Sequence, residues 1–109
     1  MFEILVGDIF TISGLGTVFA GKIRSGSISV GDPVVCKTRA TEIHSQVIGL
    51  QEVATGRSIK RAEAGSTVGV ICRKIKQSSL ADAFEGEGNN MRVVEVTLVS
   101  GSKKRWWQF

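Results

Sequence analysis

The chain has 109 residues, enough for one ordinary domain and too few for two separate cores. Hydrophobic residues make up 42% and charged residues 22% of the chain, with a net charge of +4, which excludes wholesale disorder. No apolar run approaches the ~18 residues that span a membrane, and the N-terminus lacks the pattern of a signal peptide. We therefore expect a cytoplasmic globular domain with no membrane contact.

The dominant hydrophobic period along the chain is two, which predicts strands. A Gly-Asp-Pro turn is expected at residues 31–33, and Ser-Gly-Ser at 25–27 is expected to end a strand. Thirteen glycines and one proline divide the chain into short segments. The segments predicted as strands are residues 2–12, 17–23, 28–30, 34–37, 42–50, 68–72 and 94–98. This pattern predicts an all-β barrel or sandwich.

The second half of the chain adds a different pattern. Residues 78–84, Ser-Ser-Leu-Ala-Asp-Ala-Phe, start with a serine cap candidate and predict a short helix. We expect three parts: a strand-rich part over residues 1–76, an additional helix and C-terminal strand over residues 77–99 that pack on it or complete it, and a basic-aromatic tail over residues 100–109.

Gly16, Gly21 and Lys22 have the spacing of a phosphate-binding P-loop, G-x-x-x-x-G-K. The motif needs a Ser or Thr next, whose hydroxyl binds magnesium, and this chain has Ile23. It also needs a loop that opens a helix, whereas Thr17–Ala20 are strand formers and a turn follows. We therefore expect no nucleotide at this stretch.

Catalytic and metal-binding chemistry has little support in the sequence. His44 is the only histidine, and neither Cys36 nor Cys72 has a spacing to it that suggests a nucleophile and base. Two cysteines on apolar strands are most often small core residues. One histidine and two cysteines are too few ligands for a metal site. We therefore predict no enzyme, no metal and no cofactor.

The basic residues are unevenly distributed along the chain. Residues 54–78 hold six bases against Glu63 alone, a distribution that suits phosphate contact but also an ordinary solvated surface. The candidate surface for RNA or a partner is Arg57, Lys60, Arg61, Arg73, Lys74 and Lys76.

The C-terminal tail combines bases with adjacent tryptophans. Its candidate docking residues are Lys103, Lys104, Arg105, Trp106 and Trp107. Such a segment can contact nucleic acid or a membrane, fold back over an apolar patch, dock on a partner or remain disordered. Fold-back or partner docking is favoured because exposed tryptophans promote association.

Residues 7–32, Gly-Asp-Ile-Phe-Thr-Ile-Ser-Gly-Leu-Gly-Thr-Val-Phe-Ala-Gly-Lys-Ile-Arg-Ser-Gly-Ser-Ile-Ser-Val-Gly-Asp, carry a recognisable pattern. This stretch resembles the start of the second domain of elongation factor Tu and related translational GTPases. Residues 62–75 resemble a later element of the same domain, so the resemblance covers roughly residues 2–76. The matching positions are Asp8, Ile9, Phe10, Gly14, Gly16, Thr17, Val18, Gly21, Lys22, Gly26, Ile28, Val30, Gly31 and Asp32.

The chain departs from this family at informative positions. Leu15 stands where the family has arginine. In elongation factor Tu a pocket on this domain holds the terminal adenosine of aminoacyl-tRNA; its glutamate aligns with Ile48 and its asparagine with Thr67. Residues after Ile75 match nothing in the family, and no GTPase domain is present in this sequence.

The resemblance implies an all-β fold, a small closed Greek-key-like barrel of about six strands over residues 1–76. It also implies a non-catalytic accessory domain whose relatives contact a GTPase domain, the ribosome and tRNA. We therefore expect a binding module for RNA, either tRNA or ribosomal, or for a translation-related protein. An interaction or oligomerisation module without a translation role is the alternative.

Overall fold

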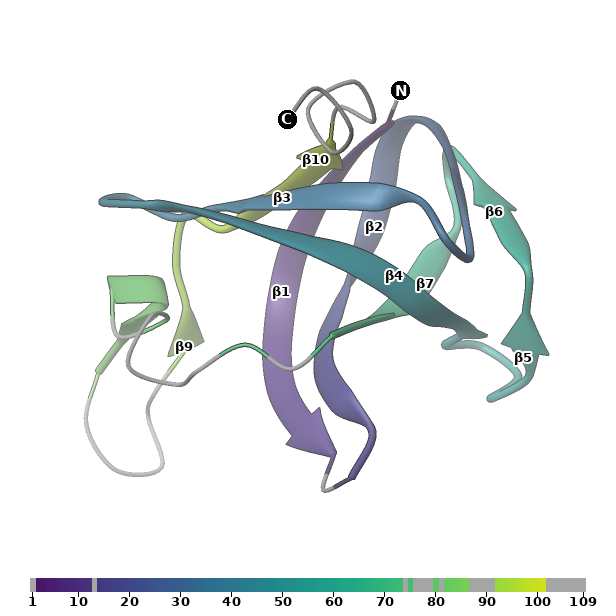
Figure 1. Ribbon diagram of the computed structural model, residues 1–109, viewed down its shortest axis with the longest axis horizontal. Helices are drawn as coiled ribbons and strands as arrows, with labels where there is room; N and C mark the ends of the chain where they lie inside the picture. Colours follow the sequence, from purple (N-terminus) through teal and green to yellow (C-terminus); the bar gives the residue numbers. More distant parts are fainter. Residues whose placement is uncertain are drawn as a thin grey trace, which may run out of the picture.

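The structure is a computed structural model that describes residues 2–12, 14–73, 75, 80, 82–86 and 92–101. Strands dominate these residues (Figure 1). The strands are β1 (Phe2–Ile12), β2 (Gly16–Ser29), β3 (Pro33–Lys37), β4 (Glu42–Glu52), β5 (Ser58–Ile59), β6 (Arg61–Glu63), β7 (Thr67–Cys72), β8 (Phe84–Glu85), β9 (Arg92–Val93) and β10 (Thr97–Ser100).

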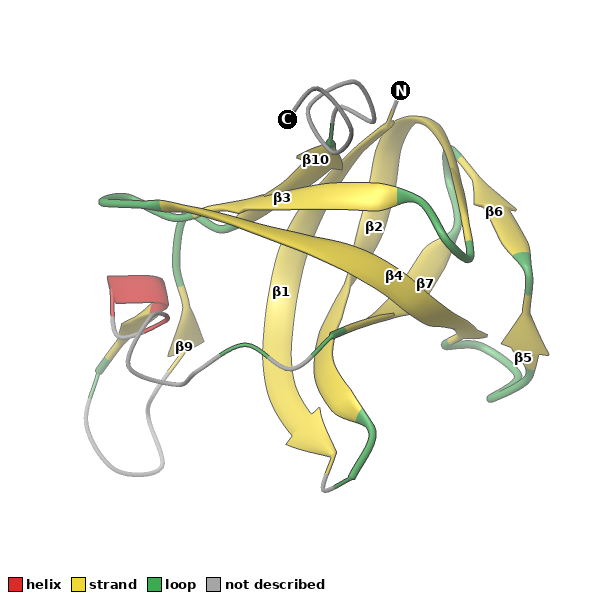
Figure 2. Cartoon of the chain, in the orientation of Figure 1, coloured by secondary structure: helices red, strands yellow, loops and turns green. Residues whose placement is uncertain are grey.

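Six antiparallel strands form a closed barrel, which confirms the predicted fold class. Their order around the barrel is β1-β10-β3-β4-β7-β2, and β2 pairs with β1 to close it. The hairpins β1–β2 and β3–β4 cross at a steep angle, as expected for the tilted strands of a small barrel (Figures 1 and 2). Closure leaves no open edge on these six strands over their paired lengths.

Glycine allows the β1–β2 wall to bend. A Cβ on Gly21 would collide with the carbonyl oxygen of Leu5 and lie 3.1 Å from the Cα of Val6, so only glycine fits there. The pairing register of the two strands shifts close to this point, between Val6 and Asp8. Such a bulge bends a strand and increases its twist, which helps a narrow sheet to close.

The prediction that Ser-Gly-Ser ends a strand is wrong. β2 continues through residues 25–27, and Gly26 adopts a φ of 75° within it. Beyond this glycine the strand exchanges partners and pairs with β6, with Ile28 opposite Ala62. The predicted turn at residues 31–33 is confirmed, because Gly31 has a φ of 97° and Asp32 accepts a hydrogen bond from the Ser29 N–H at 2.9 Å.

β5 and β6 form a strap that runs from β4 to β2. β5 pairs with β4, with Ile59 opposite Leu50, and β6 pairs with the far end of β2. Within the strap the side chain of Ala62 is buried, while the basic side chains of the strap face solvent. In Figure 1 the strap lies at the right of the barrel.

In the segment 78–84, which was predicted as a short helix, none of the residues that the structure describes is α-helical. Leu80, Asp82 and Ala83 lie in a 3₁₀ turn, and Phe84 already belongs to β8, which pairs with β9 (Figure 2). So short a segment gains little from helix formation, because helix nucleation is costly. Leu80 and Ala83 instead bury their side chains against the barrel core.

The last predicted strand begins later than expected. Glu95 has a φ of 51°, which interrupts an extended chain, and β10 starts at Thr97. β10 is inserted between β1 and β3, with Leu98 opposite Ile4 on one side and Cys36 on the other. The C-terminal strand β10 is therefore one of the six strands of the barrel.

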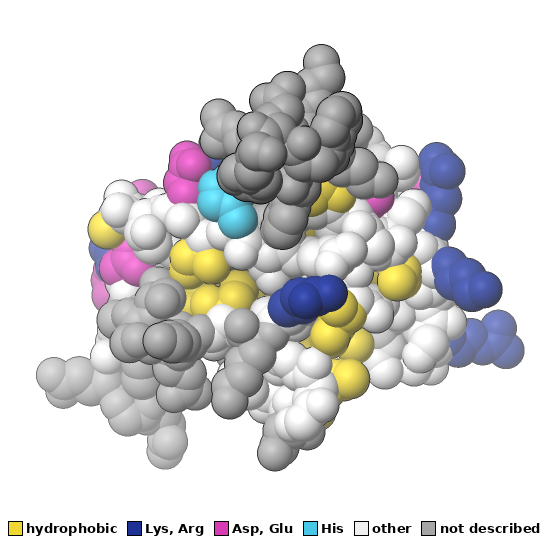
Figure 3. Space-filling view, in the orientation of Figure 1, with side chains coloured by type: hydrophobic (Ala, Val, Ile, Leu, Met, Phe, Trp, Pro, Cys, Tyr) yellow, Lys and Arg dark blue, Asp and Glu magenta, His cyan; other side chains and the backbone are white. Residues whose placement is uncertain are grey.

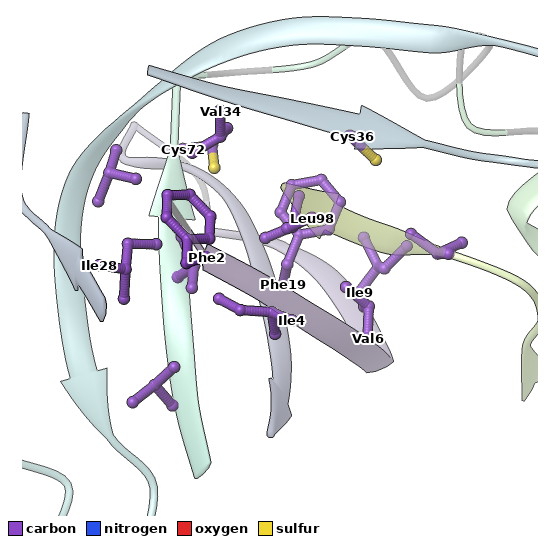
Figure 4. Packing of buried hydrophobic residues seen from close by; sticks show 14 of the residues in the cluster. Phe2, Ile4, Val6, Ile9, Phe19, Ile28, Val34, Cys36, Cys72 and Leu98 are labelled. Carbon is purple, nitrogen blue, oxygen red and sulfur yellow. The ribbon is translucent and has the colours of Figure 1, made fainter. Parts of the chain in front are cut away.

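Side chains from β1, β2, β3, β7 and β10 meet inside the barrel (Figure 4). Phe19, Ile4 and Leu98 have no exposed surface. The predicted strand at residues 68–72 is confirmed, and its alternating residues Val68, Val70 and Cys72 are all fully buried. The one buried threonine, Thr17, accepts a hydrogen bond at 3.0 Å from the Ile75 N–H, which holds the chain that leaves β7 against β2.

Candidate functional site

The stretch with P-loop spacing is strand. Gly16, Gly21 and Lys22 all lie in β2, between β1 and β7. A Cβ on Gly16 would collide with the carbonyl oxygen of Cys72, so this glycine serves close packing between strands. The side chain of Lys22 is exposed on the outer wall. The backbone N–H groups here bond to neighbouring strands and do not form a phosphate cradle.

Three of the predicted basic residues gather on the strap. Arg57, Lys60 and Arg61 are all exposed, and Figure 3 shows Lys and Arg side chains projecting along this edge. We call residues 57–63 the basic strap. Acidic neighbours are present as well, since Arg61 Nη2 lies 3.5 Å from Glu63 Oε1 in a pair whose side chains are 62% and 73% exposed. An ion pair this exposed is worth little and leaves the guanidinium available to a stronger anionic partner.

The backbone of each strap base is anchored to the barrel. The carbonyl of Arg57 accepts a hydrogen bond from the Glu52 N–H at 2.8 Å, and the carbonyl of Lys60 accepts one from the Val30 N–H at 3.0 Å. Arg61 is paired with β2. The three charged side chains thus project from fixed positions, which lowers the entropic cost of contacting a ligand.

The other predicted bases do not belong to the strap. Arg73 is exposed, but it follows β7 at the end opposite to Thr67, where the chain leaves the strap. Its N–H donates to the Gln46 carbonyl of β4 at 3.2 Å. Lys74 and Lys76 lie outside the described residues, as do the tail residues Lys103, Lys104, Arg105, Trp106 and Trp107.

The two positions that align with the adenosine pocket of elongation factor Tu lie apart. Ile48 sits in a bulge of β4 opposite the Ile71–Cys72 end of β7 and is 39% exposed. Thr67 is exposed at the other end of β7, roughly 15 Å away at ~3.3 Å per strand residue. The structure therefore does not bring these two side chains together.

The candidates for catalysis are also separate. His44 is exposed on β4 opposite Val35, whereas Cys36 and Cys72 are buried. Burial raises the pKa of Cys36 to about 11 and that of Cys72 to about 12, so both thiols stay protonated and poorly nucleophilic. Among the described residues, no group of three or more His, Cys, Asp or Glu side chains could hold a metal ion.

One polar cluster joins two segments, around residues 38–40 and 82–85, that no sequence motif connects. Asp82 accepts hydrogen bonds from the Thr38 hydroxyl at 2.7 Å and from the Ala40 N–H at 2.8 Å. Arg39 donates to the Asp82 carbonyl and lies 3.5 Å from a Glu85 carboxylate oxygen. The Thr38 hydroxyl, the Ala40 N–H and the Arg39 charge lower the pKa of Asp82. This cluster fixes the 3₁₀ turn to the tip of the β3–β4 hairpin.

Comparison with known proteins supports the fold. No protein-family model matches the chain. Among solved structures, the chain is similar to GDP-bound aIF5B from Aeropyrum pernix, with a TM-score of 0.66 at 17% sequence identity. The match covers 95% of this chain and 17% of that one, so this chain spans less than a fifth of aIF5B. At this identity the likeness shows a shared fold.

The same comparison extends beyond the first 76 residues. Because the match covers 95% of this chain, the structural likeness cannot be confined to residues 1–76. The part of the chain that the structure describes contains no helix that could serve as a membrane span.

Proposed function

We propose that this chain is a non-catalytic binding module of the translation-factor barrel type, and that it contacts RNA through the basic strap. The observation that carries the proposal is the presence of Arg57, Lys60 and Arg61 together on one anchored, solvent-facing edge. The likeness to a barrel of aIF5B makes tRNA or ribosomal RNA in the cytoplasm the expected ligand. No catalytic role is assigned to any residue.

The chemistry of the strap suits phosphate. Guanidinium and ammonium groups bind phosphate oxygens through charge-assisted hydrogen bonds, and they do so without reading base sequence. Three such contacts predict that log K falls with log[salt] with a slope of roughly −2 to −3 from the strap. Binding should therefore be moderate, sensitive to salt and broadly tolerant of RNA sequence.

The test uses fluorescence anisotropy of labelled tRNA with the full chain over a series of salt concentrations. Lys60→Glu should weaken binding and lower the salt slope by about one unit. Lys37→Glu is the matched control, because Lys37 is exposed on β3 away from the strap and pairs only loosely with Glu42 at 4.0 Å. The triple reversal Arg57→Glu/Lys60→Glu/Arg61→Glu should remove about two to three units of slope.

The basic tail does not affect the comparison between these variants, because its charges are the same in each of them. Equal effects of Lys60→Glu and Lys37→Glu would show that only net charge matters and would overturn the assignment to the strap. Failure of the unmodified chain to bind tRNA at low salt would overturn RNA contact itself.

A further inference from the structure

The end of the barrel at the β1–β2 hairpin turn carries an apolar outer surface. Ile12 is 39% exposed and Leu15 is 47% exposed, on either side of a turn closed by a hydrogen bond from the Leu15 N–H to the Ile12 carbonyl at 3.0 Å. Ile48, on β4, is exposed to the same extent as Ile12. Phe10, 46% exposed, continues the apolar surface along the outer side of β1. We call Ile12, Leu15, Ile48 and the adjoining Arg73 the hairpin-end surface.

Close packing makes these side chains neighbours. The Cδ1 of Ile48 lies 3.5 Å from the position that a Cβ would occupy on Gly16, the residue that follows Leu15. The absence of a side chain on Gly16 allows the bulged β4 residue to lie against β2. Ile71 packs in the same way over Gly49, with its Cδ1 3.2 Å from the Cβ position. Two glycines therefore let isoleucines from β4 and β7 cover the wall as a smooth apolar layer.

Arg73 places a positive charge at the border of this layer. The carbonyl of the preceding Cys72 lies against Gly16. Ile71 of β7 faces outward, and Arg73, directly after the strand, is exposed two residues further on. Its backbone is held on both sides, since the Arg73 N–H donates to Gln46 and its carbonyl accepts from the Ser45 hydroxyl at 3.4 Å. No salt bridge to Arg73 is found among the described residues.

In Figure 3 hydrophobic side chains gather beside a basic one near the hairpin end of the barrel. Isolated apolar residues on a surface need no explanation, but a contiguous group bordered by an arginine has the composition of a protein-binding site. Leu5, Val30 and Val53 are exposed at positions outside the hairpin-end surface, which makes them useful controls.

The size of the surface indicates what covers it. The apolar side chains here, Ile12, Leu15, Ile48 and the adjoining Phe10, are each about two fifths exposed. Together they offer roughly 300 Å², well under the ~800 Å² per partner of a stable interface between folded subunits. A second copy of the chain would also bring a like-charged molecule to the surface, because the chain carries a net charge of +4. A short segment fits both the area and the charge.

We propose that the hairpin-end surface docks a short segment of another protein that carries apolar side chains and at least one Asp or Glu. The apolar side chains cover Leu15 and Ile48, and the carboxylate pairs with Arg73. This interaction is separate from the RNA contact of the basic strap, which lies at the opposite end of β7.

The proposal is tested by selecting binders to the immobilised full chain from a random peptide library displayed on phage. Enriched peptides should combine aliphatic or aromatic residues with Asp or Glu. Ile48→Asp and Arg73→Glu should each weaken the binding of a selected peptide by roughly tenfold or more. The matched controls Val53→Asp and Arg24→Glu, at exposed positions outside the surface, should leave binding unchanged.

Three results would overturn the proposal: no enrichment, enrichment of basic peptides, or selected peptides that bind the Ile48→Asp and Arg73→Glu variants normally. Circular dichroism of each variant shows whether it is folded before its affinity is interpreted. A separate measurement addresses RNA. If the neutral variant Ile48→Ser lowers affinity for tRNA and leaves the selected peptide bound, the surface serves RNA and the proposal fails.

Discussion

Replacing Thr17 by valine tests how the chain beyond β7 is attached to the barrel. Thr17 is fully buried, and its Oγ1 accepts the hydrogen bond of the Ile75 N–H at 3.0 Å. Valine has nearly the same shape but cannot accept this bond, so it leaves a buried N–H without a partner. Such a group costs about 1–3 kcal/mol. For a domain of this size the loss should lower the melting temperature by ~4–12 °C.

The measurement is thermal unfolding by circular dichroism, together with hydrogen exchange at the Ile75 amide. Thr67→Val is the matched control, because Thr67 is exposed on β7 and its hydroxyl makes no hydrogen bond among the described residues. That variant should lie within about 0.5 kcal/mol of the parent chain. Equal melting temperatures for the two valine variants, or undiminished protection of the Ile75 amide in Thr17→Val, would refute the reasoning.

Further predictions concern packing, pH and thiol chemistry. Gly21→Ala should lower the free energy of unfolding by about 1–3 kcal/mol or more, because the new Cβ would collide with the backbone of β1. Gly7→Ala should be tolerated, because the nearest atom to its Cβ position lies at 3.9 Å. Chemical denaturation of the two variants tests this difference. The Thr38 hydroxyl holds the pKa of Asp82 below its ordinary 3.8, so this carboxylate stabilises the fold above about pH 4, and that contribution is lost as pH falls through the lowered pKa. Asp82→Asn should therefore lower the melting temperature at neutral pH and converge with the parent chain near pH 2; a constant difference would argue against the cluster. The two buried cysteine thiols should resist a thiol reagent at pH 8 until the chain unfolds, and rapid labelling of the native chain would contradict their burial.

The period-two pattern was sufficient to predict the strands because it reports which side chains face inward, whereas the closed barrel was predicted from the family resemblance. Val68, Val70 and Cys72 alternate with outward residues, and all three are buried. The turn before Pro33 was equally readable, since glycine and aspartate have a direct conformational role there. These features depend on residues that are close in the sequence, so local sequence patterns could predict them.

The features that sequence reasoning missed depend on distant partners. The strand was expected to end at residues 25–27, but β2 continues to Ser29 because its last residues pair with β6. The contact between Arg39 and Asp82 spans more than forty positions, and neither residue has a local motif that announces it. The backbone of Glu95 leaves the extended conformation, which a glutamate in the sequence does not predict.

The candidate surfaces illustrate the same limit. A cluster of six bases in the sequence suggested one surface, but β7 carries Arg73 away from the strap that holds Arg57, Lys60 and Arg61. Leu15 could be identified in the sequence as an exposed-turn candidate beside Gly16, whereas its proximity to Ile48 depended on the approach of β4 to Gly16. RNA contact and peptide docking both stay predictions until they are measured.

The insertion of β10 between β1 and β3 has a consequence for how the chain folds during synthesis. Residues 97–100 bond to residues 3–5 and 34–37, and the Phe2 N–H donates to the Ser100 hydroxyl at 2.6 Å. Until these last residues leave the ribosome, β1 and β3 each present an edge with free N–H and C=O groups. Such edges recruit other strands, and closing a contact across most of the chain is slow. A nascent chain that stalls before residue 97 should therefore aggregate more readily than the finished barrel.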